Sequence, residues 1–335
     1  MHNHATDSAS EPWDTIIIGG GVAGLSAALM LGRARRRVLV IDAGQPRNRF
    51  AAHMHAVLGH ERIDPAELLR IGRADASAFG VEFAEASVTR VEEAPDGLRV
   101  ATEAGASYAA RTLIVATGIT DRLPDIPGLA EHWGTSVLHC PYCHGWEVRG
   151  RRLGVLATSP MSLHQAQLLR QWSDDVVFFA ALAGDLDEQT RRRLAARGIR
   201  IVEQAVVAVL GDGETVTGAR LEDGSILEID AIFTGGAPEP HDRMLALLGL
   251  ARSEGPMGDL ITVDPVGQTS NPRVWATGNV VNPAANVPLA MGSGSFAGAA
   301  VNAALVAREF DDAVARLSEQ AREQATREQT AEVAS

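Results

Sequence analysis

The chain has 335 residues, a net charge of −12, 46% hydrophobic and 4% aromatic residues. This length exceeds what one hydrophobic core usually holds, so we expect a globular α/β protein of two domains. The negative charge repels phosphate backbones and anionic lipid, and few aromatics are left to stack on bases. Nucleic acid and membrane surfaces are therefore excluded as partners, and we expect no stretch of membrane-spanning length.

Both cysteines lie in one motif, Cys140-Pro141-Tyr142-Cys143. The polar first residues contain no secretory signal, and a secreted disulfide scaffold would need more cysteines, so we expect a cytoplasmic protein with a redox-active pair. Half of a zinc site is the alternative interpretation. Because the chain has no second Cys-x-x-Cys, we expect no metal.

The first part of the chain has the pattern of a β-α-β unit. Asp14–Ile18 is predicted to be a buried parallel strand, and the glycine run that follows opens into a helix ending at Arg33. Val38–Ile41 is the next predicted strand. Such a unit is the usual framework of a dinucleotide site.

Glycine occupies the first, third and sixth places of this turn, at Gly19, Gly21 and Gly24. These places serve the tight turn, the close approach of a phosphate and the packing of helix on strand. Asp42 ends the second strand, where a carboxylate can accept a hydrogen bond from a ribose hydroxyl. The alternative is a plain glycine-rich loop, but the combination of strand, spacing, helix and terminal acid indicates dinucleotide binding.

A second unit begins after a linker. Arg111–Gly118 is predicted to be a buried strand with a small-residue turn, and prolines follow it. From Arg152 the pattern restarts with a strand at Leu153–Ala157, a helix at Ser162–Trp172 and a strand at Asp175–Ala180. Ile229–Thr234 closes this unit, and Val274–Asn279 resumes the first.

The pattern predicts two Rossmann-like three-layer domains, the first of them discontinuous. The predicted organisation is a disordered tail over residues 1–12, a dinucleotide domain over 13–120 and 239–308, an inserted domain over 121–238 that carries the cysteines, and a polar helical tail over 309–335.

Several motifs resemble those of low-molecular-weight thioredoxin reductases, in the same order, over residues 14–307. They are Gly19–Gly24, Ala116-Thr117-Gly118, the Cys-x-x-Cys, and Ala276-Thr277-Gly278-Asn279. Within that superfamily, the string His139–Glu147 is similar to the dithiol oxidases that close disulfides in bacterial and fungal natural products. The resemblance implies FAD in the first domain, a homodimer, and the cysteine pair against the flavin.

The resemblance also implies roles for single residues. Arg47 and Asn48 would reach the flavin, Val88 the adenine through its backbone, and Val287 would bring backbone toward the isoalloxazine. Asn279 stands where reductases carry aspartate, so a charge is lost there. The implied FAD-binding residues are Gly19, Gly21, Val22, Ala23, Gly24, Asp42, Arg47, Asn48, Val88, Gly118, Gly278, Asn279 and Val287.

One departure from the reductase pattern concerns the second glycine turn, which those enzymes use for NADPH. Here the turn reads Ala157–Ser162 and lacks both defining glycines, although Ser159 as N-cap and Pro160 as first helical residue would still begin a helix. No arginine group for a 2′-phosphate follows Phe179. We therefore expect that NADPH is not bound; a diverged site with weak residual affinity is the alternative.

Electrons would then run from a small-molecule dithiol through the cysteine pair to FAD and on to O2, giving hydrogen peroxide. By the family's order, Cys140 exchanges with the substrate and Cys143 faces the flavin. His144, where reductases carry aspartate, is the candidate base for the thiol proton.

Three further histidines are candidates for the substrate pocket: His53, His55 and His139. Two other functions stay open. One is an NADPH-dependent reductase of thioredoxin or a small disulfide, and the other is a non-catalytic, redox-responsive flavoprotein.

Overall fold

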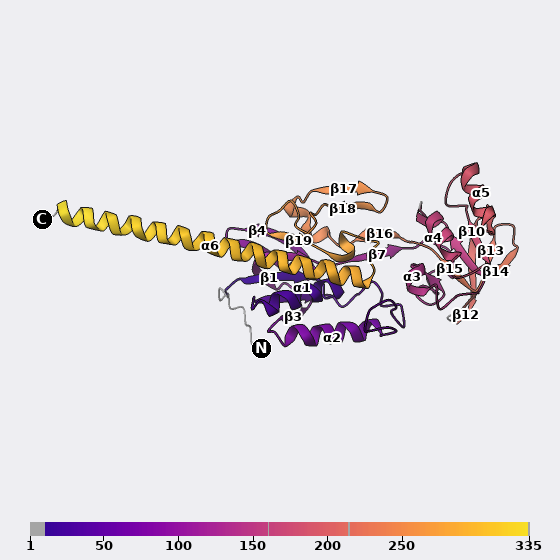
Figure 1. Ribbon diagram of the computed structural model, residues 1–335, viewed down its shortest axis with the longest axis horizontal. Coiled ribbons are helices and arrows are strands. Elements are labelled where there is room, and N and C mark those ends of the chain that lie inside the picture. Colours follow the sequence, from indigo (N-terminus) through magenta and orange to yellow (C-terminus); the bar gives the residue numbers. More distant parts are fainter. Residues whose placement is uncertain (1–10, 160, 214, 334–335) are drawn as a thin grey trace.

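The computed structural model describes residues 11–159, 161–213 and 215–333. The predicted disorder of residues 1–10, the predicted place of Pro160 in its helix, and the last two residues of the predicted helical tail lie outside the described residues. The described chain forms two α/β domains joined by a narrow link (Figure 1).

A mostly parallel sheet forms the centre of the first domain, with the strand order β3-β2-β1-β6-β5-β4 and β19 beside β6. Its parallel strands are β1 (Trp13–Ile18), β2 (Val38–Asp42), β3 (Glu82–Glu85), β6 (Ser107–Val115) and β19 (Val274–Ala276). Helix α1 (Val22–Arg33) covers one face together with α2 (Pro65–Ser77) and α6 (Val287–Val333). On the other face, β4 (Val88–Ala94) pairs antiparallel with β5 (Gly97–Thr102), and β5 pairs antiparallel with the first half of β6.

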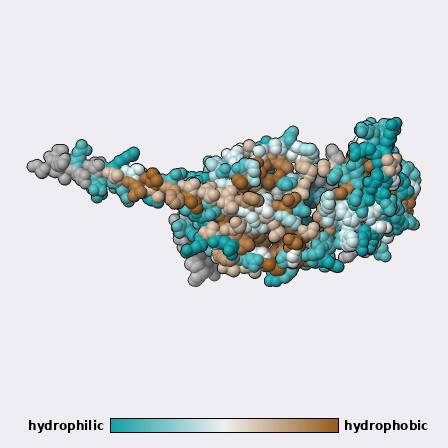
Figure 2. All heavy atoms as spheres, viewed as in Figure 1, coloured by the Kyte–Doolittle hydropathy of each residue, from teal (hydrophilic) through white to brown (hydrophobic). Residues whose placement is uncertain are grey.

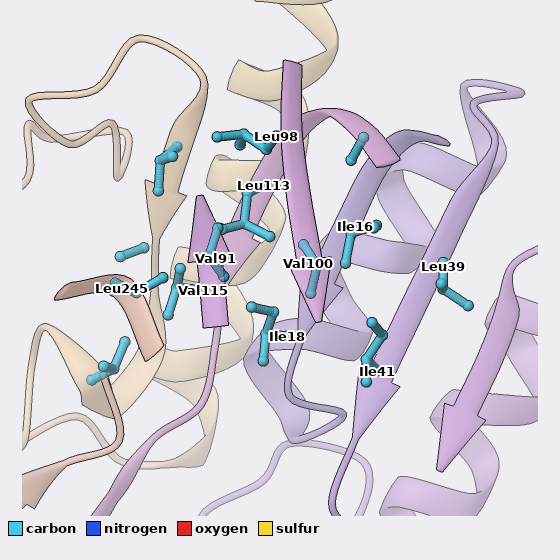
Figure 3. Close-up of a cluster of buried hydrophobic side chains, with 14 of the residues drawn as sticks. Ile16, Ile18, Leu39, Ile41, Val91, Leu98, Val100, Leu113, Val115 and Leu245 are labelled. Carbon is cyan, nitrogen blue, oxygen red and sulfur yellow. The ribbon is translucent and has the colours of Figure 1, made fainter. Parts of the chain in front are cut away.

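Both faces of this sheet are covered, which explains its nearly continuous apolar strands. Side chains alternate along each strand, so Ile16 and Ile18 pack with Leu113 and Val115 beneath β4 and β5 (Figure 3). Ile17 points the opposite way, into the cluster beneath α1 and α6. The three-layer architecture follows from this alternation.

A parallel sheet with the order β11-β10-β9-β15-β8 forms the core of the second domain. Its strands are β8 (Val137–Leu138), β9 (Leu153–Leu156), β10 (Val176–Phe179), β11 (Ile199–Val202) and β15 (Ala231–Phe233). Helices α4 (Met161–Leu169) and α5 (Glu188–Ala196) cover one face, and the antiparallel strands β12 (Val206–Asp212), β13 (Thr215–Leu221) and β14 (Ile226–Glu228) cover the other. Helix α4 is shorter than the sequence predicts, because the Trp172 N–H closes a turn on the Leu169 carbonyl.

Two strands carry the chain between the domains: β7 (Ile119–Arg122) runs outward and β16 (Ala237–Pro240) returns, and the two pair antiparallel. The remaining described elements are α3 (Pro141–His144), η1 (Arg243–Leu248), β17 (Arg252–Gly255), β18 (Gly258–Ile261) and η2 (Gly278–Val280).

Helix α6 is one continuous element, so the predicted polar tail is the outer part of a helix that begins at Val287. Figure 1 shows this outer part leaving the body of the protein. Contrary to the expectation from sequence, Val287–Gln324 is long and apolar enough to cross a membrane by length and composition alone. Its buried residues, among them Ala297 and Val301, pack on α1, and the core helices of globular proteins pass the same test.

Candidate active site

A cavity at the junction of the two domains brings the predicted motifs together. It is lined by the glycine turn after β1, the loop after β2, helix α3 and the start of α6. The cysteine pair belongs to the second domain and the glycine turn to the first, so both domains contribute to one site.

The glycine turn has the close backbone contacts that the sequence predicts. Gly19 has a φ of +103°, and a Cβ there would lie 2.4 Å from the Ala116 carbonyl oxygen. A Cβ on Gly24 would lie 1.9 Å from the Gly19 oxygen. Gly21, by contrast, has nothing within 4 Å of its Cβ position and faces the cavity.

This turn fits a dinucleotide. Gly21 is the N-cap of α1 and supplies no side-chain hydrogen bond, so the first N–H groups of the helix are free to meet a phosphate. The buried Thr117 hydroxyl, which lines the cavity, has no hydrogen-bond partner among the described residues. Asp42 also lines the cavity at the end of β2. These groups can hold an adenosine diphosphate.

Arg73 is a part of this site that sequence reasoning missed. Its guanidinium, on α2, donates to one carboxylate oxygen of Asp42 at 2.7 Å and lies over the Phe83 ring. It thereby orients the Asp42 carboxylate at the end of β2. Arg73 belongs to no motif, so no signal in the sequence could have found it.

Arg47 lines the cavity, and it also clamps the link between the domains. It makes two hydrogen bonds of 2.7 Å to the buried carboxylate of Asp121 on β7 and a third, also of 2.7 Å, to the Pro283 carbonyl. Asn48 beside it donates to the Met54 sulfur at 3.0 Å.

The other predicted cofactor residues divide into two groups. Val22, Ala23, Gly118, Gly278, Asn279 and Val287 line the cavity, whereas Gly24 and Val88 do not. Val88 pairs with Thr102 at the start of β4 and packs against the core. The Asn279 amide donates to the carbonyls of Asn282, at 3.1 Å, and Ala285, at 2.9 Å, and so shapes the cavity wall.

The cysteine motif begins helix α3. Cys140 is the N-cap residue, and its carbonyl accepts the N–H groups of Cys143 and His144, each at 3.1 Å. Both thiols are free, half-buried and exposed to the cavity. The short helix holds the two sulfur atoms close enough to interact with each other.

The two thiols differ in acidity. The pKa of Cys140 is lowered to about 7, chiefly because the Cys143 thiol donates a hydrogen bond to its sulfur, and also by backbone N–H groups and the charge of Arg47. That same donation and burial raise the pKa of Cys143. In the reduced pair, Cys140 is therefore the thiolate.

Two histidines flank the pair. Burial, followed by the charge of His55, lowers the pKa of His144, so its imidazole is neutral at pH 7 and can accept a proton. Burial, followed by the charge of Arg47, also lowers the pKa of His139. The His139 Nδ1 atom is buried, lacks a partner among the described residues and belongs to a residue that lines the cavity.

The loop after β2 brings His53 and His55 to the cavity. His53 is exposed, whereas the His55 side chain is only 12% exposed and lies 2.6 Å from Glu61 and 3.5 Å from Glu147. Sequence reasoning gave no role to Glu61 or Glu147, because Glu61 belongs to no motif and Glu147 only ends the string His139–Glu147.

In the second domain, the turn after β9 already satisfies its own backbone. The Ser162 hydroxyl accepts the N–H groups of Thr158, at 3.1 Å, and Ser159, at 3.3 Å. The Thr158 hydroxyl donates to the Gly235 carbonyl at 2.5 Å. Ala157 is fully buried. In the first turn, the position of Ser162 is held by Gly24, which has no side chain that could accept such N–H groups.

Comparisons with known proteins agree with this arrangement. The family model of the pyridine nucleotide-disulphide oxidoreductases matches residues 13–309. A thioredoxin reductase of Claviceps purpurea, tcpT, is 35% identical over 90% of this chain and 96% of its own length. Another from Leptosphaeria maculans, sirT, is 32% identical over 87% of this chain and 93% of its own.

Solved structures are similar as well. The crystal structure of HlmI superposes with a TM-score of 0.87 at 42% identity, covering 92% of this chain and 97% of that one. An oxidoreductase from Agrobacterium tumefaciens gives a TM-score of 0.84 at 39% identity, covering 88% and 99%. These relatives indicate a flavin cofactor.

Proposed function

Because the chain belongs to the pyridine nucleotide-disulphide oxidoreductase family, we propose that this oxidoreductase oxidises a small-molecule dithiol to a disulfide, with FAD as electron carrier and O2 as acceptor. One observation carries the proposal. The first turn offers free N–H groups to the cavity, whereas in the second turn the Ser162 hydroxyl accepts the N–H groups of Thr158 and Ser159. If the flavin site is functional and the nicotinamide site is not, NADPH cannot reduce the flavin. The electrons for the flavin must then come from the cysteine pair.

The substrate half of the reaction needs a base and an exchanging sulfur. His144 accepts the proton of one substrate thiol, and the thiolate attacks the Cys140 sulfur of the oxidised pair, so that Cys143 leaves as thiolate. Once His144 has released that proton, it accepts the proton of the second substrate thiol, and the thiolate so formed attacks the substrate sulfur of the mixed disulfide, which releases Cys140. The backbone N–H groups of Tyr142 and Cys143 and the charge of Arg47 also lower the pKa of Cys140, which makes it a better leaving group in this step.

In sum, each turnover removes two protons and two electrons from the dithiol. Bound FAD would supply the two-electron carrier between the cysteine pair and O2, which takes up two protons from water to give hydrogen peroxide. The glycine turn would hold the pyrophosphate and Asp42 the adenosine ribose. Arg47, fixed on Asp121, places a positive charge near both sulfur atoms and so stabilises the thiolate.

The second candidate is an NADPH-dependent disulfide reductase. It is favoured by the relatives tcpT and sirT, both of which are called thioredoxin reductases. The contacts of the second turn disfavour it, and so does the stretch after β10, where Ala180–Ala183 contain no cation for a 2′-phosphate.

Anaerobic mixing of the flavin-loaded protein in a stopped-flow instrument separates the two candidates. Dithiothreitol is expected to bleach the flavin and NADPH is not. Bleaching by micromolar NADPH at a rate matching turnover would make the protein a reductase.

We also propose that the protein is a cytoplasmic homodimer. Large apolar side chains stand exposed along the face of α6 that points away from α1, and some of them appear as brown spheres on the projecting helix in Figure 2. They are Leu289, Phe296, Val306, Phe310, Val314 and Leu317. The same stripe on a second copy would cover it, and Phe310→Asp should raise the monomer fraction in light scattering.

A further inference from the structure

The loop from Met54 to Ile63 presents His55 to the active site in a fixed position. The Met54 N–H donates to the Ile63 carbonyl at 2.8 Å, and the Arg62 N–H returns to the Met54 carbonyl at 2.9 Å. Ala56 and Arg62 have φ values of 60° and 67°, a region that residues with a side chain rarely adopt. Such a backbone conformation persists only where surrounding contacts hold it, so we infer that the loop has one defined conformation.

His55 connects the buried pocket to solvent. Its Nδ1 atom lies 2.6 Å from one Glu61 carboxylate oxygen, while the Ala56 N–H donates to the other at 2.9 Å. Its ring stands edge-on to the His144 ring, with 6.3 Å between centroids and an interplanar angle of 85°. The His55 side chain is 12% exposed and that of Glu61 is 60% exposed. The order from pocket to water is His144, His55, Glu61.

His144 needs such a neighbour if the proposed function is right. Each dithiol gives up two protons per turnover, and the His144 ring nitrogens make no hydrogen bond to the residues that the structure describes. A proton accepted there must leave before the next can be taken. We expect one water to bridge the two imidazole rings, whose centroids lie 6.3 Å apart.

We propose that His55 and Glu61 form the proton exit of this active site, an inference that rests on the proposed dithiol oxidation. A proton from His144 enters His55 at Nε2 through a water, while the proton on Nδ1 passes to the Glu61 carboxylate and then to bulk water. His55 gains one proton and loses one, so its charge after each transfer is unchanged.

The charges around the path agree with this direction. Burial and the charges of His55 and His139 lower the pKa of His144, while Glu147 raises it, so a proton on His144 is readily passed on. The hydrogen bond from His55, then that from the Ala56 N–H, lowers the pKa of Glu61, which favours release of its proton to water. Glu147 lies 3.5 Å from His55 Nε2.

The test is anaerobic stopped-flow reduction of the bound flavin by dithiothreitol, from about pH 6 to about pH 9. We expect His55→Gln to slow the reduction about tenfold at pH 7, and added imidazole to restore it. The deficit should shrink toward the thiol pKa of about 8.5, where thiolate forms without a base. Glu61→Gln should act in the same direction but more weakly. His60→Gln, an exposed histidine of the same loop, is the matched control.

Two results would overturn the proton path: a His55→Gln rate equal to that of the parent protein at every pH, or a deficit that neither pH nor imidazole changes. The second result would give His55 a packing role only. Failure of dithiothreitol to reduce the flavin of the parent protein is a different outcome. It would refute the proposed dithiol oxidation, and the proton path that rests on it would fall as well.

Discussion

Both domains contain a strand, a turn and a helix in the same arrangement, but the backbone N–H groups of the two turns differ in their partners. In the first, Gly21 leaves the start of α1 uncapped and open to the cavity. In the second, Ser162 reaches back from α4 and occupies the N–H groups of Thr158 and Ser159. The sheets and helices are alike, so the difference lies in a few side chains at the turn. A Rossmann-like fold therefore does not by itself imply a bound nucleotide.

The largest expected effect comes from closing the first turn. Gly21→Leu should abolish FAD binding, because the new side chain would occupy the space of the pyrophosphate. Gly21 has an extended backbone, with φ −71° and ψ 178°, and free space at Cβ, so the fold should tolerate leucine. Flavin content per chain, beside circular dichroism, measures this. Ser159→Leu makes the matching change in the second turn and should leave the flavin content unchanged. An equal loss of flavin in both variants would contradict the proposed difference between the two turns.

Next in size is the loss of either sulfur. Cys140→Ser and Cys143→Ser should each abolish dithiol oxidation and the matching peroxide, while FAD stays bound. With Cys143 facing the flavin, only Cys140→Ser should show a long-wavelength charge-transfer band. In the parent protein, iodoacetamide should react at Cys140 with a rate that rises through about pH 7. A band in Cys143→Ser instead would reverse the order of the pair.

The sequence could predict the features that depend on neighbours along the chain. The glycine spacing, the apolar strands and the Cys-x-x-Cys are local signals, and the family and the α/β fold that they predict are confirmed. The predicted roles of the site residues stay predictions, although most of these residues line one cavity.

The sequence could not predict contacts between distant segments. Arg73 meets Asp42 from another helix, and Glu61 reaches His55 only because strained residues fold the loop back on itself. The continuity of α6 was also missed, because the switch from apolar to polar composition near Glu309 looks like an end, whereas the helix continues past it. Such features depend on packing, which periodicity does not record.

A smaller effect is expected from His144→Ala, which should slow turnover at pH 7 by about 10²–10⁴-fold and retain FAD. Since burial lowers the pKa of His144, its imidazole stays neutral at pH values somewhat below the usual histidine pKa of about 6.5. The turnover rate of the parent protein should therefore stay constant there and fall only at more acidic pH. The same shift means that the neutral ring stabilises the fold above about pH 6.5, and that this stability is lost as pH falls through the lowered pKa. A variant rate equal to the parent rate at pH 7 would make His144 a packing residue.

The smallest effect is expected from opening the second turn. Ser162→Ala frees two N–H groups and should cost about 1 kcal/mol of unfolding free energy, as the loss of a hydrogen-bond partner usually does. Ser318→Ala is the matched control, since its hydroxyl bonds only to the Val314 carbonyl on the exposed part of α6, and guanidinium unfolding compares the two. Flavin content should not change, and NADPH should still fail to bleach the flavin, because freed N–H groups supply no cation for the 2′-phosphate. If NADPH did bleach the flavin of Ser162→Ala, one hydroxyl would be all that separates this domain from a working nicotinamide site.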